Sequence, residues 1–299
     1  MNLDLAQLRA FFLVVQAGSF SGAARRLFRT QSAVSHAIRK LEDSAGTRLL
    51  IRHGRLVRPT EEGRRLYAAC ETVFSTLEVA QDDLHRERGR AEGRIRLGAT
   101  IEFGSSVLMR HIRPFLAAHP GIEMDFHLSP DLLAPLLREE IDLAIDCVKH
   151  DSPHLERTVL FREAYMVACS PSYQAGQGIR RPEDLARCTV LSIDKECAWW
   201  RRFLVGFPKR RGIAFGRVIA INHIRGMIHA AVSDLGVLIA PSYSLQGELA
   251  RGGLVPLFPS IRPLEDRFAL YQKTAKAGLL RHRLLKEYLQ SLRLSEFGA

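Results

Sequence analysis

Thr30-Gln31-Ser32-Ala33-Val34-Ser35-His36-Ala37-Ile38-Arg39-Lys40-Leu41-Glu42 is the stretch that best predicts the fold of the N-terminal region. Within it, Val34, Ile38 and Leu41 recur at the spacing that places them on one face of an α-helix. The opposite face carries only hydroxyl, imidazole and basic side chains: Ser32, Ser35, His36, Arg39 and Lys40. This face is either an ordinary solvated surface or a surface for a polyanion, because phosphates and base edges accept hydrogen bonds from such groups.

The residues before this helix favour the second interpretation. An apolar helical face over residues 5–15 ends at Gly18, and a short helix over residues 22–28 follows, with Ser21 as its expected N-cap. A tight turn at residues 29–31 leads into the helix quoted above. Two short helices joined by such a turn, the second with a polar and basic free face, are typical of a helix-turn-helix.

A basic hairpin after the third helix predicts a wing. Residues 48–52 and 56–60 are strand-like, and His53-Gly54-Arg55 is the turn between them. We expect Arg52, Arg55 and Arg58 either to follow the phosphates or to enter a minor groove, although Arg58 has the alternative of pairing with a nearby acid.

The charge distribution also favours an anionic partner. The 299-residue chain has a formal net charge of +11, and residues 1–60 hold ten Lys or Arg against three acids, a net charge of +7. A hydrophobic content of 46% and a charged content of 25% are ordinary for a soluble globular protein. A basic balance of this size favours nucleic acid or a membrane surface as the partner.

The sequence favours the cytoplasm over the membrane or the exterior. Met1-Asn2-Leu3-Asp4 lacks the basic start and apolar core of a signal peptide, and no run of about 18 apolar residues predicts a membrane span. The five cysteines, at positions 70, 147, 169, 188 and 197, are odd in number and form no CxxC motif. A reduced, cytoplasmic compartment fits this pattern best.

A long helix is expected from residue 61 to about residue 90, because this segment contains no Pro and its Gly residues lie near its two ends. Its apolar residues follow a heptad pattern: Leu66, Cys70, Val73, Leu77, Ala80 and Leu84. Such a seam buries itself either against a second copy of the chain or against its own N-terminal domain. Gly89 and Gly93 then mark a short hinge.

Residues 94–299 alternate between strand-like and helix-like segments, which predicts a parallel α/β sheet with right-handed crossovers. The predicted strands are 94–99, 121–128, 141–145, 165–169, 189–193, 217–221, 236–240 and 267–272. The predicted helices are 105–118, 131–138, 199–205, 222–232, 243–251 and 278–292.

Polar residues that follow these strands are candidates for ligand binding, because open α/β sheets bind ligands outside the carboxyl ends of their strands. They are Thr100, Glu102, Ser129, Asp131, Asp194 and Asn222. Asp131 and Asn222 are equally good N-caps and need no ligand. His223 and Arg225 either add positive charge for an acidic ligand or face solvent.

The N-terminal sixty residues resemble the signature of the LysR-type transcriptional regulators. The matching pattern is Phe11-x-x-Val14-x-x-x-Gly18-Ser19-Phe20-Ser21-x-Ala23-Ala24-x-x-Leu27-x-x-Thr30-Gln31-Ser32-Ala33-Val34-Ser35-x-x-Ile38-x-x-Leu41-Glu42, continued by Gly46-x-x-Leu49-x-x-Arg52 and Thr60-x-x-Gly63. Leu50 departs from the Phe usual in the family, which exchanges one apolar core residue for another.

The resemblance implies a DNA-binding, effector-responsive regulator whose third helix enters the major groove. The positions that would contact DNA are Thr30, Gln31, Ser32, Ser35, His36 and Arg39, with Arg52, Arg55 and Arg58 on the wing. Thr30 and Ser32 have the alternative of capping the helix, and His36 the alternative of facing only solvent. As a regulator, the protein would also meet RNA polymerase.

The resemblance further implies an antiparallel dimer through the linker helix, with Leu66, Val73, Leu77, Ala80 and Leu84 in the contact. It implies a two-lobed effector domain like those of periplasmic binding proteins, with crossings near residues 162–166 and 265–269. Thr100 and Ser129 would meet a carboxylate of the effector, which makes an organic acid one candidate, and Asp194 and Asn222 would line the same site.

Enzymatic and metal-dependent functions find little support in the sequence. G-x-S-x-G, G-x-x-x-x-G-K-[ST] and H-E-x-x-H motifs are absent, and the histidines at 111, 119, 127, 150 and 154 do not have metal-ligand spacing. Peroxide-sensing members of the family carry a reactive cysteine near the place of Cys197, but no cysteine follows Cys197, and Cys188 would be its nearest pairing partner. We therefore expect no catalytic residues, no metal and no cofactor.

The fold class predicted is α/β with an N-terminal, mainly α winged helix-turn-helix, a long linker helix and a two-lobed effector domain. The expected domains are residues 1–60, 61–92 and 93–299, with lobe I at about 93–163 and 267–299 and lobe II at about 164–266. The function predicted is a homo-oligomeric, effector-switched regulator of transcription. Two rivals remain: a solute-binding protein with a basic appendage, and a nucleoid-type protein with little sequence preference.

Overall fold

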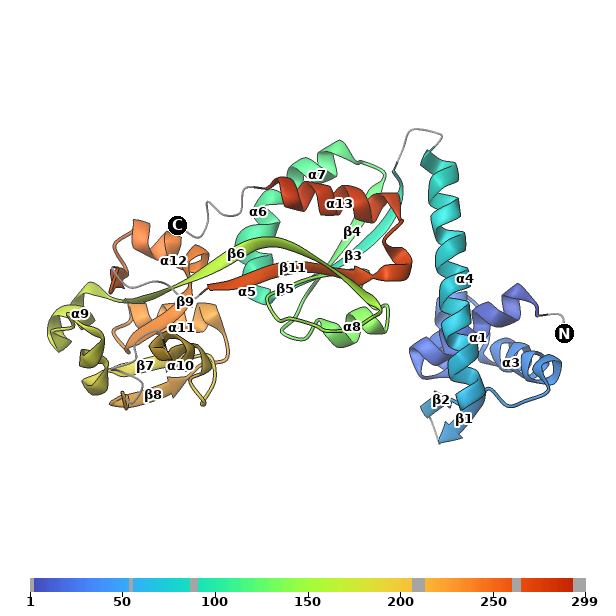
Figure 1. The fold of residues 1–299 in the computed structure, drawn as a ribbon, viewed down its shortest axis with the longest axis horizontal. Helices are drawn as coiled ribbons and strands as arrows, with labels where there is room; N and C mark the ends of the chain where they lie inside the picture. The colour runs from blue at the N-terminus through green and yellow to red at the C-terminus, as the bar shows by residue number, and fades with distance from the viewer. Residues whose placement is uncertain (1–2, 54–55, 87–90, 206–212, 260–264, 293–299) are drawn as a thin grey trace.

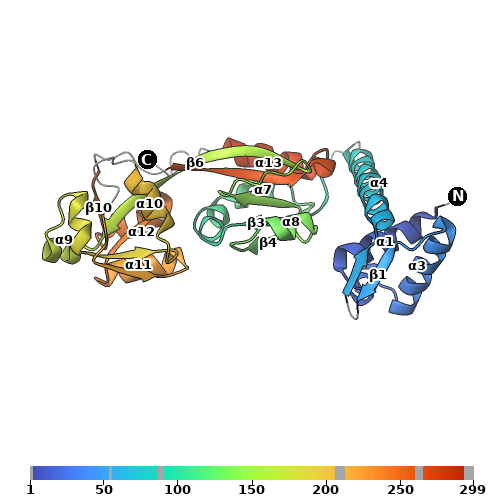
Figure 2. The same cartoon turned by 60° about the horizontal axis from the view of Figure 1, so that its bottom comes forward.

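The computed structural model describes residues 3–53, 56–86, 91–205, 213–259 and 265–292. Three parts follow one another along the long axis of the molecule: a small helical head, a single long helix, and an α/β domain of two lobes (Figures 1 and 2). The head and lobe II lie at opposite ends, with lobe I between them. The head, which would bind DNA, is therefore far from lobe II. The long helix and lobe I connect the two.

The head is a three-helix unit with a two-stranded wing. Its elements are α1 (Leu5–Ala17), α2 (Phe20–Leu27), α3 (Gln31–Ala45), β1 (Leu50–His53) and β2 (Leu56–Pro59). Its core is formed by the apolar faces of all three helices, with Phe11, Val34 and Leu41 at or near zero exposure. The periodicity in the quoted stretch thus corresponds to the buried face of α3.

The start of α2 differs from the prediction. Its N-cap is Ser19, whose Oγ accepts a hydrogen bond from the Gly22 backbone N–H at 3.1 Å. Ser21, the predicted cap, lies inside the first turn and donates its hydroxyl to Gln31 instead. Phe20, the first residue of α2, is buried in the head core, so the helix begins two residues earlier than predicted.

The wing is held against α3 and the long helix by backbone contacts. β1 and β2 are antiparallel, and the Glu42 carboxylate accepts hydrogen bonds from the backbone N–H groups of Leu49 and Leu50 at 2.8 and 3.1 Å. Gly63 lies so close to the Leu49 carbonyl that a Cβ would be 2.0 Å from its oxygen, so only glycine fits there. The turn residues Gly54 and Arg55 lie outside the described residues.

Helix α4 (Glu61–Arg86) divides the predicted heptad seam into two parts. Cys70 is 2% exposed and Leu66 is partly buried, and both pack into the core of the same chain's head. Leu66 therefore has at least part of its contact within its own chain, and a dimer contact for it stays a prediction. The remaining seam residues are exposed: Val73, Leu77, Ala80 and Leu84. Part of the predicted hinge, residues 87–90, lies outside the described residues.

One continuous sheet runs through both lobes in the order β4-β3-β5-β11-β6-β9-β7-β8, with β10 paired to β6. The strands are β3 (Gly93–Ala99), β4 (Ile122–Leu128), β5 (Leu143–Asp146), β6 (Leu155–Cys169), β7 (Thr189–Ser192), β8 (Arg217–Ala220), β9 (Val237–Pro241), β10 (Val255–Leu257) and β11 (Glu265–Lys273). The outer pairs β3–β4 and β7–β8 are parallel, as the alternation predicted. The middle of the sheet is antiparallel, because β11 and β6 run against their neighbours, so the prediction of a wholly parallel sheet is wrong there.

β6 is much longer than the predicted strand 165–169. Residues 155–164 pair with β11 in lobe I, and residues 165–169 pair with β9 and β10 in lobe II. Its first half was not predicted, because the residues there alternate only between exposed and half-buried positions and so lack the contrast of a strand with one buried face. This one strand therefore belongs to both lobes.

Helices cover the sheet on both faces. They are α5 (Ile101–Phe103), a π-helical segment (Gly104–Leu108), α6 (Met109–His111), α7 (Arg113–Ala118), α8 (Leu133–Leu137), α9 (Pro171–Gln177), α10 (Ala198–Val205), α11 (Ile224–Val232), α12 (Ser242–Ala250) and α13 (Leu280–Ser291), with 3₁₀ turns at Pro182–Arg187 and Thr274–Lys276. The predicted helix 105–118 begins earlier and is interrupted, since Pro114 lies in the first turn of α7 and cannot continue a helix before it.

The two lobes meet through aromatic rings, which we call the aromatic boundary: Phe103, Phe161, Phe268 and Tyr243. Phe161 and Phe268 stack at 4.9 Å between ring centroids, and Phe103 lies 4.9 Å from Phe268. Tyr243, on α12 of lobe II, meets Phe103 edge to face at 6.3 Å. Contact between the lobes is therefore largely apolar at this point.

Lobe I meets α4 through charged side chains, which we call the ionic joint: Glu71, Glu78, Glu139, Asp142, Lys273, Lys276 and Arg281. Lys273, only 8% exposed, pairs with Glu71 of α4 and lies 3.1 Å from Glu139. Lys276 is 3.2 Å from Glu139 and 3.6 Å from Asp142, and Arg281 pairs with Glu78 of α4. These pairs fix the position of α4 on lobe I.

Two carboxylates of the ionic joint, those of Asp142 and Glu139, are held ionised. Burial alone would raise the pKa of Asp142, but a hydrogen bond from Arg96 and the charges of Lys276 and Arg96 outweigh it and lower that pKa to about 2. The pKa of Glu139 is lowered in the same way, against its burial, by Lys276 and Lys273. These two carboxylates are thus charged throughout the physiological pH range.

Candidate nucleic-acid interface and effector site

The outer face of α3 carries the predicted DNA-contacting residues in an accessible position. Gln31, Ser32, His36 and Arg39 are exposed, and Ser35 is half-buried. The buried side of the same helix anchors it in the head core, so the polar face is presented by a rigid support. A helix fixed in this way can enter a major groove without reorganising the head.

Thr30 and Gln31 are oriented by contacts at the start of α3. Thr30 is the N-cap, and its Oγ1 accepts a hydrogen bond from the Ala33 backbone N–H at 3.2 Å while lying 3.0 Å from the Ser32 hydroxyl. The Gln31 side-chain oxygen accepts a hydrogen bond from Ser21 of α2 at 3.0 Å. Thr30 therefore has the capping role that was its alternative, and both residues remain exposed toward a ligand.

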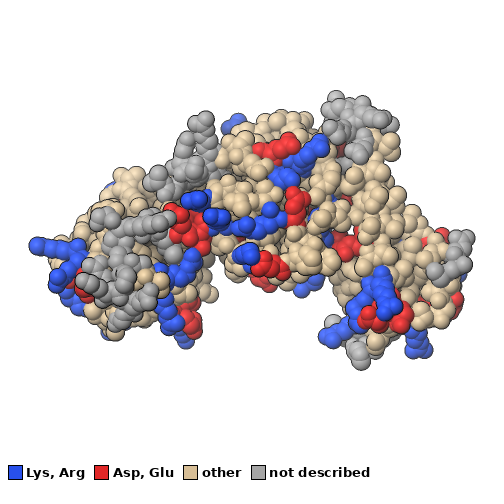
Figure 3. All heavy atoms as spheres, in the orientation of Figure 1, with Lys and Arg blue, Asp and Glu red and all other residues tan. Residues whose placement is uncertain are grey.

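Basic residues surround this face. Arg29, after the end of α2, is exposed, as is Arg58 of the wing. Arg25 and Arg26 of α2 are also exposed but line the cavity against lobe I. Figure 3 shows Lys and Arg side chains projecting from the lower edge of the head. Arg52 lies in β1, and Arg55 lies outside the described residues. This arrangement suits contacts to the phosphates on either side of a groove.

In lobe I, the structure brings the predicted effector residues Thr100 and Ser129 together. The parallel pairing of β3 and β4 ends with a hydrogen bond from the Ser129 backbone N–H to the Ala99 carbonyl at 3.1 Å. Thr100 is the N-cap of α5, but its side chain makes no capping bond. Ser129 Oγ accepts a hydrogen bond from the Asp131 backbone N–H at 3.2 Å. The backbone pairing thus places two hydroxyl-bearing residues at neighbouring positions on the carboxyl edge of the sheet.

In lobe II, Asp194 and Asn222 follow the neighbouring strands β7 and β8, but neither position matches the prediction in full. Asp194 accepts a hydrogen bond from the backbone N–H of Ala198 at 3.1 Å and so caps α10. Helix α11 begins at Ile224 with His223 as its N-cap, so Asn222 precedes the cap and is exposed. The capping role suggested as an alternative for Asn222 is therefore wrong.

The sequence did not predict that Glu102 and Arg225 form a pair between the lobes. Arg225 of α11 donates to the Glu102 carboxylate at 2.6 Å and to the Ser106 hydroxyl at 2.8 Å. Both residues follow strand ends, which marked them as candidates. Their partnership joins residues 123 apart in the chain, and no local pattern encodes it.

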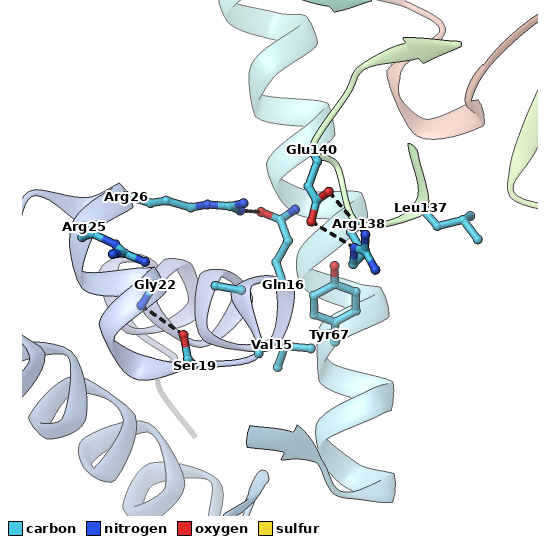
Figure 4. Close-up of a pocket in the computed structure, with 12 residues that line it drawn as sticks. Val15, Gln16, Ser19, Gly22, Arg25, Arg26, Tyr67, Leu137, Arg138 and Glu140 are labelled. Carbon is cyan, nitrogen blue, oxygen red and sulfur yellow. Dashed lines mark hydrogen bonds and ion pairs between the residues drawn. The ribbon is translucent and has the colours of Figure 1, made fainter. Parts of the chain in front are cut away.

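Two cavities lie on the other side of lobe I, against the head and α4. One, of about 670 Å³, is lined by residues of α1, α2 and α4 and of the segment after α8, among them Gln16, Arg26, Tyr67, Arg138 and Glu140 (Figure 4). Figure 4 shows the hydrogen bond between Gln16 and Arg26. The Gln16 amide also donates a hydrogen bond to the Glu139 carboxylate at 3.0 Å. The other, of about 1230 Å³, is lined by residues of α1 and α4 together with six of the seven residues of the ionic joint. Both cavities lie between the head, α4 and lobe I and not between the two lobes, so we assign neither of them to the effector.

The described residues offer little for redox, metal or membrane functions. The five cysteines are all free, and burial raises the pKa of the Cys188 thiol. Across the described ranges, His, Cys, Asp and Glu form no group of three that could hold a metal ion. In that same part of the chain, no helix is both long and apolar enough to cross a membrane.

Comparison with known protein families matches two regions of the chain. Residues 5–64 match the family described as bacterial regulatory helix-turn-helix protein, lysR family. Residues 88–293 match the family described as LysR substrate binding domain. The two matches cover the head with its wing and the two-lobed domain.

Individual proteins match along most of their length. The chain is 28% identical over 273 residues to the transcriptional regulator PtxR of Pseudomonas aeruginosa, covering 90% of this chain and 87% of that protein. It is 29% identical over 287 residues to the glycine cleavage system transcriptional activator of Escherichia coli K12, covering 92% and 89%. The crystal structure of ArgP from Mycobacterium tuberculosis shares the fold, with a TM-score of 0.72 at 20% identity and 97% of both chains covered.

Proposed function

The chain belongs to the LysR-type transcriptional regulators, and from this premise we propose which of its residues read DNA, hold the effector and join two copies. The family membership makes it a DNA-binding regulator of transcription with an effector-binding domain, and not an enzyme. What remains to be assigned is how this particular chain performs each task.

We propose that Gln31, Ser35, His36 and Arg39 read base edges, while Thr30, Ser32 and the wing arginines contact phosphates. The observation that carries this assignment is the exposed, acid-free face of the first turns of α3 on a buried support. Arg is the residue most suited to bidentate recognition of guanine, and each such contact contributes roughly 1–3 kcal/mol of discrimination.

Arg39→Ala tests the assignment. We expect binding to the cognate promoter duplex to weaken by about tenfold or more, and binding to a random duplex to weaken far less. Arg65→Ala is the matched control, since Arg65 is an exposed arginine of α4 away from α3. Fluorescence anisotropy at two salt concentrations measures both. Equal losses on the two duplexes would place Arg39 on a phosphate and overturn its base-reading role.

We propose that two copies associate through the exposed stripe of α4, formed by Val73, Leu77, Ala80 and Leu84. Val73 and Leu77 are each 43% exposed and Leu84 is 65% exposed, which is unusual for apolar residues on a single helix face. A second stripe of the same kind would bury them. Paired heads would also match the two half-sites that helix-turn-helix proteins read.

Leu77→Asp should convert the protein to monomers in light scattering, because it places a charge in the proposed contact. Thr72→Asp is the control, since Thr72 is exposed on the same helix but off the stripe. If Leu77→Asp keeps the mass of the wild-type oligomer, the stripe does not join the copies.

We also propose that the protein acts in the cytoplasm, binds a small organic acid between its lobes and contacts RNA polymerase at the promoter. The adjacent hydroxyls of Thr100 and Ser129 and the cation of Arg225 support an acidic effector. In vitro transcription with purified polymerase tests the last point. If moving the binding site by half a helical turn leaves the transcript yield unchanged, the contact proposal is wrong.

A further inference from the structure

The pair Glu102–Arg225 connects lobe I directly to lobe II. Arg225 Nη2 lies 2.6 Å from Glu102 Oε1 and 2.8 Å from Ser106 Oγ. Ser106 also donates its hydroxyl to Glu102 Oε1 at 2.6 Å. The three side chains form a closed cluster in which each member contacts the other two.

The cluster lies where the effector residues are. Glu102 is two residues after Thr100, at the carboxyl end of β3, and Arg225 is the second residue of α11, which follows β8. Ser106 belongs to the π-helical segment Gly104–Leu108. Such segments are rare and occur frequently at functional sites, because they re-aim a side chain at a small cost in stability.

The two charged partners differ in exposure. The Glu102 side chain is 6% exposed, whereas the Arg225 side chain is 40% exposed. Arg225 can therefore turn to another anion, but Glu102 cannot exchange its partner for water. A buried carboxylate that loses its cation is strongly destabilised, typically by several kcal/mol.

This asymmetry restricts the ligand. A simple carboxylate that drew Arg225 away would leave Glu102 buried and unpaired. A simple amine would pair with Glu102 and leave Arg225 without its anion. A molecule that carries both groups supplies a carboxylate to Arg225 and an ammonium group to Glu102. Both side chains then keep an oppositely charged partner, and the net charge of the site does not change.

Donors for the carboxylate are present on both sides. His223, the N-cap of the nine-residue helix α11, makes no side-chain capping bond to the first turn that carries Arg225. Thr100 makes no such bond at α5 either. The N–H groups of a helix start and a hydroxyl, together with a guanidinium, are suited to holding a carboxylate.

We propose that the effector is a small zwitterion, an amino acid by chemical class, whose carboxylate binds Arg225 and whose ammonium group binds Glu102. This inference rests on the proposed effector site between the lobes and narrows the organic acid proposed there. The ligand then replaces a direct contact between the lobes with two contacts of its own, so its length and shape set the distance between Glu102 and Arg225.

The test uses the full-length protein and measures thermal shift, followed by calorimetry for each compound that shifts the melting temperature. The probes are the proteinogenic L-amino acids and their D-enantiomers. Every amino acid that binds is compared with its matched des-amino carboxylic acid and its decarboxylated amine. Glu102→Gln and Arg225→Gln are measured in parallel, and Arg251→Gln, a surface arginine of lobe II, is the control.

Wild-type protein should bind at least one amino acid about tenfold or more tightly than either matched compound. Glu102→Gln removes the buried charge, so it should reverse the preference and bind the des-amino acid at least as tightly as the amino acid. Arg225→Gln should lose binding of the amino acid by about tenfold or more, and Arg251→Gln should not. A variant that merely damaged the fold would weaken all ligands and would not reverse their order.

Two results would overturn the inference: no amino acid binds the wild-type protein, or a des-amino acid binds it as tightly as its parent. Binding of the promoter duplex by the same preparations is measured separately. If the duplex binds and the amino acids do not, the ligand class is wrong while the regulator with its base-reading helix stands. If an organic acid without an amino group binds and changes promoter affinity, the effector site stands and only the zwitterion is rejected.

Discussion

The ionic joint and the aromatic boundary are two contacts of the same lobe, and they use opposite chemistry. The joint holds α4 with paired acids and bases, most of them buried or nearly so, whereas the boundary holds lobe II through Tyr243, which packs edge to face on the ring cluster of lobe I. Burial of rings contributes stability in proportion to area and with little directional demand. Charges contribute less net stability, because desolvation offsets their attraction, but they tolerate few alternative arrangements. The joint therefore specifies where α4 lies, and the boundary supplies cohesion.

Near each contact lies a titratable group that burial keeps in its neutral form, and the pKa values of these two groups shift in opposite directions. His282 of α13 is fully buried near Asp142 and Arg281, and burial lowers its pKa to about 3. Glu163 of β6 is 2% exposed near Tyr165 and Tyr243, and burial raises its pKa to about 8. Both groups are therefore uncharged at pH 7, beside a charged joint in one case and beside aromatic rings in the other.

The largest effect on stability is expected from Phe268→Ala. Phe268 is 1% exposed and stacks on Phe161, so its removal leaves a cavity in the boundary and should lower the free energy of unfolding by about 4 kcal/mol. Urea unfolding measures the change. Val159→Ala, at an exposed apolar position of β6, is the control and should cost far less. Similar losses for the two variants would show that cohesion does not depend on the buried rings.

Lys273→Met should have the next largest effect. It keeps the length of the side chain but leaves Glu71 and Glu139 without their shared cation, at an expected cost of about 3 kcal/mol. Lys149→Met is the control, because Lys149 pairs with Asp151 at the surface, where an ion pair contributes little. If Lys273→Met is as stable as the wild type, the ionic joint orients α4 without stabilising it, and the aromatic boundary differs from it even more.

His282→Leu should change the pH dependence of stability. The unfolded chain protonates this histidine below its usual pKa of 6.5, and the folded chain does so only near pH 3, so wild-type stability falls as the pH drops through this window. The variant lacks this loss and should gain about 2 kcal/mol relative to the wild type between pH 6.5 and pH 5. Parallel urea curves at several pH values measure it. A constant difference between the two proteins would mean that His282 is protonated in the fold.

Glu163→Gln should show the smaller and opposite pH effect. The unfolded carboxyl ionises near 4.5 and the folded one near 8, so wild-type stability falls as the pH rises between these values. Between pH 6 and pH 7 the variant should gain about 1.4 kcal/mol over the wild type. The same urea curves test this, with Glu265→Gln as a control because Glu265 is an exposed acid on the neighbouring strand β11. A gain that does not change with pH would show that Glu163 is already ionised.

The features predicted from the sequence were the local ones. The periodicity of Val34, Ile38 and Leu41 identified the buried face of α3, because neighbours on a helix face are close in sequence. The choice of Ser19 over Ser21 as cap was missed, since it depends on Phe20 being buried by other helices. Contacts between distant residues had no local signal.

The pairs Lys273–Glu71 and Arg225–Glu102 illustrate this limit. Their members lie 202 and 123 residues apart. In the sequence, each of these charged residues has the same local pattern as a charge on the surface. Similarly, the heptad pattern of α4 did not reveal that Leu66 and Cys70 pack on the head. The same spacing suits a helix that packs on its own chain and a helix that packs on a second copy. Long-range pairing thus decided the finer points of both candidate sites.

The strand β6 gives the molecule a mechanical property. Its first residue, Leu155, lies opposite Lys273 of the ionic joint, and its last, Cys169, lies deep in lobe II, with the aromatic boundary between them. An extended backbone that is hydrogen-bonded along both halves resists bending and stretching but accepts torsion. We therefore expect a rotation of lobe II to be transmitted to Lys273 as a twist of β6. The twist should occur most easily at the register shift between Phe268 and Ala269 on the partner strand β11. In such a molecule effector binding would rotate lobe II relative to the ionic joint and would not shift it along the strand.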